Sequence, residues 1–149
     1  MIFMFGRTVS GFGSRAKRGA APLSLTVVDD GGGTGPSDLE IIGPAGGSVT
    51  AAIADVGINL TASASGGAGG YSYAWTNFEL ADDDGVFSVS ATGTTNQATY
   101  SGLVIAMDTS GDSGGEEHAG SYRIRCTVTD SASATATADY NLNLIGVVE

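Results

Sequence analysis

An alternation of apolar and polar side chains between residues 122 and 128 constrains the fold of this chain more than any other feature. Tyr122, Ile124, Cys126 and Val128 occupy every second position, and arginine or threonine fills the positions between them. A side-chain period of two is typical of a β-strand that buries one face and exposes the other. The glycine two positions before the tyrosine predicts the start of the strand, and the Asp-Ser pair after it predicts the turn that ends it.

Similar patterns elsewhere predict that the whole chain is built from strands. Residues 132–144 alternate without interruption, which predicts a strand of roughly 40 Å at about 3.3 Å per residue. Most strands are much shorter, so we expect either a bulge within this strand or an end that runs past the domain. Further strands are expected at residues 48–53, 56–64, 71–75, 86–89 and 97–106.

Two of these segments resemble PKD-type domains, which belong to the immunoglobulin-like class. The run Gly-Gly-Tyr-Ser-Tyr-Ala-Trp that ends at Trp75 resembles their third strand, and Gly-Ser-Tyr122 followed by Thr-Val-Thr-Asp130 resembles their closing motif. The resemblance covers about residues 38–145. It implies an all-β, immunoglobulin-like (PKD-type) antiparallel β-sandwich, whose core would include Leu60, Tyr73, Trp75, Tyr122, Ile124, Cys126 and Val128.

The sequence divides into three segments. Residues 1–21 form an extended arm, residues 22–37 contain a short strand and a glycine-rich linker, and residues 38–149 form the sandwich. Because Cys126 is the single cysteine, no disulfide forms within the chain. With no secretory signal expected at the start of the sequence, we predict a protein made in a reducing cytoplasm.

Charge is distributed very unevenly along the chain. Four of its six basic residues and none of its 16 acidic residues lie in the first 18 positions, so the arm carries +4 and the remainder −14. An acidic body repels nucleic acid and anionic membranes, and neither is an expected partner. The arm is expected to anchor to an acidic protein surface, through Phe3, Phe5, Arg7, Phe12, Arg15, Lys17 and Arg18.

Candidates for catalysis or metal binding are few. His118, the one histidine, follows two glutamates, and no nucleophile motif accompanies it, so we expect an exposed loop histidine and no enzyme activity. The acidic loops are most simply solvated, and no metal or cofactor is expected. The alternative is a calcium site that combines oxygen ligands from two connections between strands, namely Asp82, Asp84, Asp108 and Asp112.

Stand-alone domains of this kind resemble accessory virion proteins of tailed bacteriophages, which assemble in the host cytoplasm and leave by lysis. The resemblance implies a structural virion protein, a capsid decoration protein in preference to a tail or fibre component. Its partners would be other virion proteins, copies of itself and host-surface glycans. Two other classes remain open. One is a subunit of an extracellular filament or adhesin joined by strand addition through residues 22–28 or the last strand, and the other is the accessory binding module of an enzyme.

Overall fold

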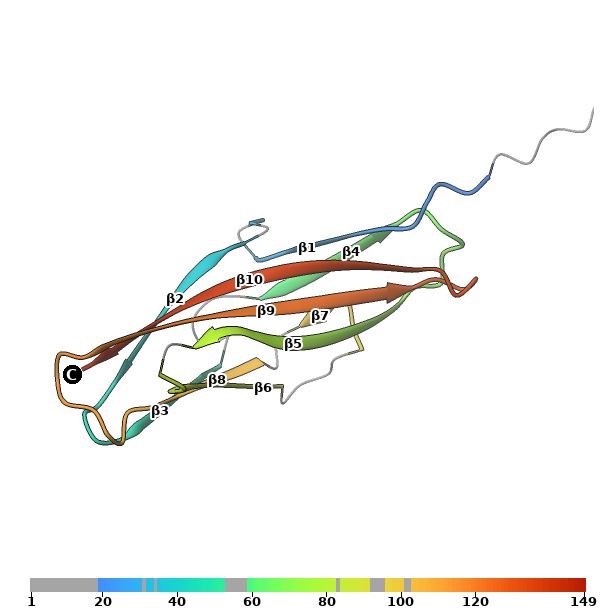
Figure 1. Ribbon diagram of the computed structural model, residues 1–149. Coiled ribbons are helices and arrows are strands. Elements are labelled where there is room, and N and C mark those ends of the chain that lie inside the picture. Colours follow the sequence, from blue (N-terminus) through green and yellow to red (C-terminus); the bar gives the residue numbers. More distant parts are fainter. Residues whose placement is uncertain are drawn as a thin grey trace, which may run out of the picture.

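The computed structural model describes residues 19–30, 32–33, 35–52, 59–82, 84–91, 96–100 and 103–149. These residues form an all-β structure in which no helix occurs (Figure 1). Consequently, the described part of the chain has no helix of the length and apolar character needed to cross a membrane. The strands are β1 (Ser24–Val28), β2 (Ser37–Gly43), β3 (Ser48–Ala52), β4 (Leu60–Ser65), β5 (Ser72–Asp82), β6 (Phe87–Ala91), β7 (Thr99–Tyr100), β8 (Leu103–Asp108), β9 (Glu117–Thr129) and β10 (Thr135–Val148).

The strands form three sheets. A four-stranded sheet has the order β2-β10-β9-β5, and two three-stranded sheets have the orders β1-β4-β7 and β3-β8-β6. All strand pairs are antiparallel except β2 with β10, which run parallel. The expected sandwich was antiparallel throughout. The difference arises because β2 follows β1 without a reversal of direction and so reaches the edge of β10 parallel to it (Figure 1).

A long hairpin of β9 and β10 is the centre of the four-stranded sheet. The two strands pair residue for residue from Thr135 opposite Thr129 to Val147 opposite Glu117. The expectation that β10 would either bulge or run past the domain is wrong, because its second half pairs with β2 on the other side. Strand β9 also begins at Glu117, three residues before the glycine that was expected to start it.

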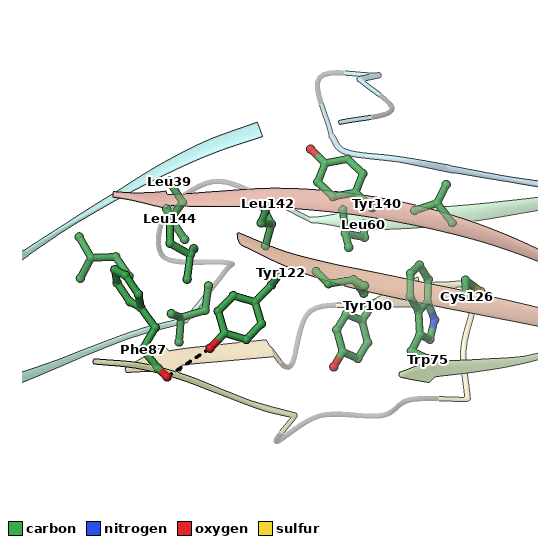
Figure 2. Close-up of a cluster of buried hydrophobic side chains, with 14 of the residues drawn as sticks. Leu39, Leu60, Trp75, Phe87, Tyr100, Tyr122, Cys126, Tyr140, Leu142 and Leu144 are labelled. Carbon is green, nitrogen blue, oxygen red and sulfur yellow. Dashed lines mark hydrogen bonds between the residues drawn. The ribbon is translucent and has the colours of Figure 1, made fainter. Parts of the chain in front are cut away.

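The apolar core is shared by all three sheets. Figure 2 shows side chains from the four-stranded sheet facing Leu60 and Tyr100 of one smaller sheet and Phe87 of the other. Among the expected core residues, Tyr73 is partly buried against this cluster. The others have at most 4% of their surface exposed, namely Leu60, Trp75, Tyr122, Ile124, Cys126 and Val128.

Two aromatic side chains connect the sheets by packing and hydrogen bonding. Trp75 stacks on Tyr100 with ring centroids 5.1 Å apart, and its Nε1 donates to the carbonyl of Gln97 at 2.8 Å. The hydroxyl of Tyr122 donates to the carbonyl of Phe87 at 3.2 Å (Figure 2). Tyr122 therefore joins β9 to the β3-β8-β6 sheet from the middle of its strand.

The sheets begin earlier in the chain than the expected boundary at residue 38. Strand β1 pairs with β4 along its whole length, and Val27 is part of the core. The described residues of the expected linker form a turn in which the amide of Gly33 donates to Asp29 Oδ1 at 2.8 Å. The hydroxyl of Tyr140 donates to the other oxygen of Asp29 at 2.7 Å, so this turn is fixed to β10.

The sandwich has two distinct ends. At the proximal end, residues 21–23, 66–70 and 130–134 meet, and the amide of Gly67 donates to the carbonyl of Ala21 at 2.7 Å. At the distal end, residues 43–48, 84–86, 108–118 and 147–149 meet, and the amide of Gly115 donates to the carbonyl of Val148 at 2.7 Å. The chain enters β1 at the proximal end and finishes at the distal end (Figure 1).

Candidate functional site

Three polar or charged side chains are buried among the described residues, and they differ in what they contact. The hydroxyl of Thr109 donates to the carbonyl of Pro44 at 2.6 Å, and Asp130 accepts backbone N–H groups from two turns. Thr109 and Asp130 therefore provide hydrogen-bond partners for backbone groups of loops. His118 instead faces charged side chains, which makes its surroundings the strongest candidate for a functional site in the described structure.

His118 is the second residue of β9 and lies opposite Gly146 of β10. Only 8% of its surface is exposed. Its Nδ1 lies 3.0 Å from Oδ2 of Asp84, in the connection between β5 and β6. Its Nε2 lies 3.1 Å from Oδ2 of Asp112, in the connection between β8 and β9. The prediction of an exposed loop histidine is wrong, because β9 pairs with β10 as far as Glu117.

The two carboxylates change the acid–base behaviour of the imidazole. The hydrogen bond that His118 donates to Asp84 raises the pKa of His118 above its usual value, Asp112 adds to this effect, and burial opposes it. A neutral imidazole has one N–H donor, so hydrogen bonds to both carboxylates require the protonated ring. Both nitrogens face carboxylates rather than a hydroxyl or thiol, so in this arrangement the ring is not placed to activate a nucleophile.

Glu116 completes a cluster with metal-ligand geometry. One ligand atom each from Asp112, Glu116 and His118 lies within 4.8 Å of the others. Asp112 is partly buried and Glu116 is exposed. Glu116 Oε1 accepts a hydrogen bond from the amide of Ser113 at 3.3 Å, so its carboxylate is held over the same loop. A nitrogen and two carboxylate oxygens are a donor set suited to zinc and related divalent ions.

The four aspartates considered for calcium do not act as one group. Asp82 accepts the amides of Gly85 and Phe87 at 3.1 and 3.0 Å. Asp108 accepts the amide of Ser110 at 3.0 Å, and this bond holds the pKa of Asp108 below its usual value. These two carboxylates therefore stabilise turns, whereas Asp84 and Asp112 contact His118.

Glu116 was not among the candidate ligands expected from the sequence, although a signal was present. Glu116 and His118 are separated by one residue, and in an extended chain such residues lie on the same face. Asp112 precedes Glu116 by four residues and His118 by six in a glycine-containing loop, which allows the chain to fold back. The contribution of Asp84 was not visible locally, because it comes from a connection 34 residues away.

The residues of the expected anchoring arm lie outside the described part of the chain. They are Phe3, Phe5, Arg7, Phe12, Arg15, Lys17 and Arg18. The described chain begins at Gly19 with exposed residues that lead into β1.

Comparisons with known proteins identify no family for this chain. No protein-family model matches it, and no curated protein matches it. Among solved structures, it is similar to a nucleoside hydrolase-related hypothetical protein from Saccharophagus degradans that is associated with carbohydrate metabolism. The identity is 17%, the TM-score is 0.35, and the match covers 85% of this chain but 26% of that protein. This likeness is too weak to bear on function.

Proposed function

We propose that this chain is a non-enzymatic structural protein of a virion, an immunoglobulin-like sandwich joined to the particle by its N-terminal arm. A capsid decoration protein of a tailed bacteriophage is the form that we favour. The observation that carries the proposal is that the two ends of the molecule differ in charge. The chain enters at the proximal end directly after the +4 arm, whereas acidic residues gather at the distal end, namely Asp84, Asp108, Asp112, Glu116, Glu117 and Glu149.

The strand order supports the immunoglobulin-like part of this proposal. In that fold, strands C, F and G form one sheet, and strands A, B and E belong to the other. In the proposed correspondence, β5, β9 and β10 would be C, F and G, while β1, β4 and β7 would be A, B and E, which agrees with the observed neighbours in each sheet. The sheet β3-β8-β6 and the parallel strand β2 are additions to this pattern.

The pairing of the terminal strands favours anchoring by the arm over strand addition. Residues 22–28 and the last strand are the segments that would complete a neighbour's sheet in a filament. However, β1 pairs with β4 of its own sandwich, and β10 pairs with β9 along nearly its whole length and with β2 in its second half. A complete sandwich that carries a separate arm needs no donated strand.

The arm has the composition of an attachment segment. Cations bind an acidic partner surface and speed association, and aromatic side chains supply much of the binding energy when they are buried at an interface. Arg7, Arg15, Lys17 and Arg18 would supply the charge, and three phenylalanines would supply the apolar contacts. The partner would be another virion protein or a second copy of this chain, assembled in the host cytoplasm. Host-surface glycans are a further partner for the outward-facing loops.

Deletion of residues 1–21 tests this function. We expect the truncated sandwich to remain soluble and folded but not to join assembled particles, as measured by copurification with particles and by electron microscopy. A second variant, in which Arg15, Lys17 and Arg18 are changed to glutamine, separates charge from apolar anchoring. A matched control replaces Arg123 and Arg125 of β9 with glutamine, which removes charge from the sandwich and should leave incorporation intact.

The location of the bound protein then decides between the alternatives. Density on the capsid lattice supports a decoration protein, and density around the tail axis would make this a tail component. Normal incorporation of the truncated chain would contradict the anchoring role of the arm.

A further inference from the structure

The cluster of His118, Asp112 and Glu116 carries more negative charge than one imidazole can neutralise. Three carboxylates, those of Asp84, Asp112 and Glu116, surround one imidazole. Even a protonated ring leaves two negative charges in excess at this place. Asp112 and His118 are largely shielded from water, whereas Asp84 and Glu116 are exposed, so the excess charge lies at the outer side of a partly buried pair, where the three carboxylates repel one another. A divalent cation would compensate the excess.

We infer that the distal end binds one zinc-class divalent cation through Nε2 of His118 and the carboxylates of Asp112 and Glu116. This site does not depend on the proposed virion function. The imidazole supplies the selectivity, because Ca²⁺ is bound by oxygen ligands whereas imidazole nitrogen suits zinc and its neighbours in the first transition row.

The outer contact of His118 matches what a metal-binding histidine requires. Such a histidine usually donates its second ring N–H to a carboxylate, which fixes the tautomer and aims the other nitrogen at the metal. The Nδ1 of His118 lies 3.0 Å from Asp84, and Nε2 is directed toward Asp112. Burial by β9 and β10 holds the ring in this orientation, since His118 lies opposite Gly146 in the pairing of these strands.

A bound ion would hold the loop between β8 and β9 to the first residues of β9, and His118 would link it to Asp84. Asp84 belongs to the connection that leads into β6, and Asp112 and Glu116 belong to the loop that leads into β9. The amide of Val148 donates to the carbonyl of Glu116 at 3.0 Å, so the same loop is also attached to the end of β10. The ion would therefore hold the loop that follows β8 against the long hairpin, and we expect it to raise the melting temperature.

Titration of the full-length chain with Zn²⁺ tests the inference. The protein carries no polyhistidine tag and is first stripped of metal with a chelator. We expect saturable 1:1 binding by calorimetry, a higher melting temperature, and no comparable response to Ca²⁺. Because His118 is the one histidine of the chain, the imidazole signals in a ¹H–¹⁵N NMR spectrum report it alone, and its Nε2 resonance should shift on addition of Zn²⁺.

Two neighbouring glutamates provide a matched pair of variants. Glu116→Gln removes an exposed ligand and should weaken Zn²⁺ binding at least ~10-fold without loss of the fold. Glu117→Gln removes the same charge one residue away and should bind like the wild type. Asp84→Asn removes the outer carboxylate and should weaken binding about 10–100-fold.

Three results would overturn the inference. The first is an absence of saturable Zn²⁺ binding to the wild-type chain. The second is equal affinity in the Glu116→Gln and Glu117→Gln variants. The third is binding of Ca²⁺ as tight as that of Zn²⁺ with an unchanged His118 resonance, which would indicate an oxygen-only site.

Discussion

Position 120, inside β9, is occupied by glycine, and the ring of Phe87 fills the space that a side chain there would need. A Cβ atom added at Gly120 would lie 2.8 Å from Cδ2 and 3.2 Å from Cε2 of Phe87. The backbone of this glycine is not in the left-handed region, so alanine meets a steric obstacle and no backbone strain. Phe87 is buried and belongs to the core cluster between the four-stranded sheet and its own sheet.

The Gly120→Ala substitution should therefore destabilise the protein. Overpacking of a core costs about 1–3 kcal/mol, whereas a glycine-to-alanine change restricts the unfolded chain and gains ~0.4–1 kcal/mol. The net loss should be roughly 0.5–2 kcal/mol, measured as a lower midpoint of urea unfolding at an unchanged slope. Gly111→Ala is the matched control, since a Cβ atom there meets nothing within 4 Å, and it should be neutral or slightly stabilising.

A double variant identifies the cause of this loss. Combined with Phe87→Leu, which removes the ring, Gly120→Ala should cost less than it does alone, so the two effects should not add. If Gly120→Ala is as stable as Gly111→Ala, or if its effect adds to that of Phe87→Leu, then the contact with Phe87 does not determine the glycine at this position.

Two further predictions concern the opposite half of the sandwich. Trp75→Ala should lower the free energy of unfolding by about 3–5 kcal/mol, as large aromatic truncations in cores do. It removes the stacking on Tyr100 and leaves the carbonyl of Gln97 without its indole partner. A nearly unchanged urea midpoint would contradict the core role of Trp75. Hydrogen bonds from the amides of Ala68, Ala134 and Ala132 hold the pKa of Asp130 below its usual value. The stabilisation is therefore present above the pKa of the unfolded chain and is lost as the pH falls through the lower folded value. The melting temperature of Asp130→Asn should thus depend less steeply on pH in the acid range than that of the wild type, and parallel profiles would refute this reasoning.

Local patterns predicted the strands well where burial on one face controls the sequence. The period of two at Tyr122 to Val128 and in the last strand corresponds to β9 and β10, and Trp75 lies in the core. The number of sheets and the parallel pairing of β2 were not predictable in this way, because a period of two does not specify the partner of a strand. The glycine at position 120 was interpreted as the start of a strand. Its place inside β9 is explained by the packing of Phe87, a tertiary contact that the sequence does not reveal.

The candidate site was less accessible to sequence reasoning than the fold. The polarity of residues 116–118 indicates a loop, and the burial of His118 depends on pairing with Gly146, 28 positions later. The four aspartates were expected on two connections between strands; Asp84 and Asp112 lie there, whereas Asp82 and Asp108 are the last residues of β5 and β8. Which of them face the histidine and which stabilise turns is decided by the geometry of each loop, which the residue types do not specify.

The single cysteine can serve as a chemical probe of how often the sandwich opens. Cys126 is free and has no exposed surface, and burial raises its pKa to about 11. Thiol reagents need an accessible thiolate, so we expect Cys126 not to react with them while the sandwich is closed. A molecule becomes labelled only while β9 is uncovered, and the rate of labelling then measures how often the two halves of the sandwich separate. Any thiol introduced at the surface can be modified alone while the native one stays protected.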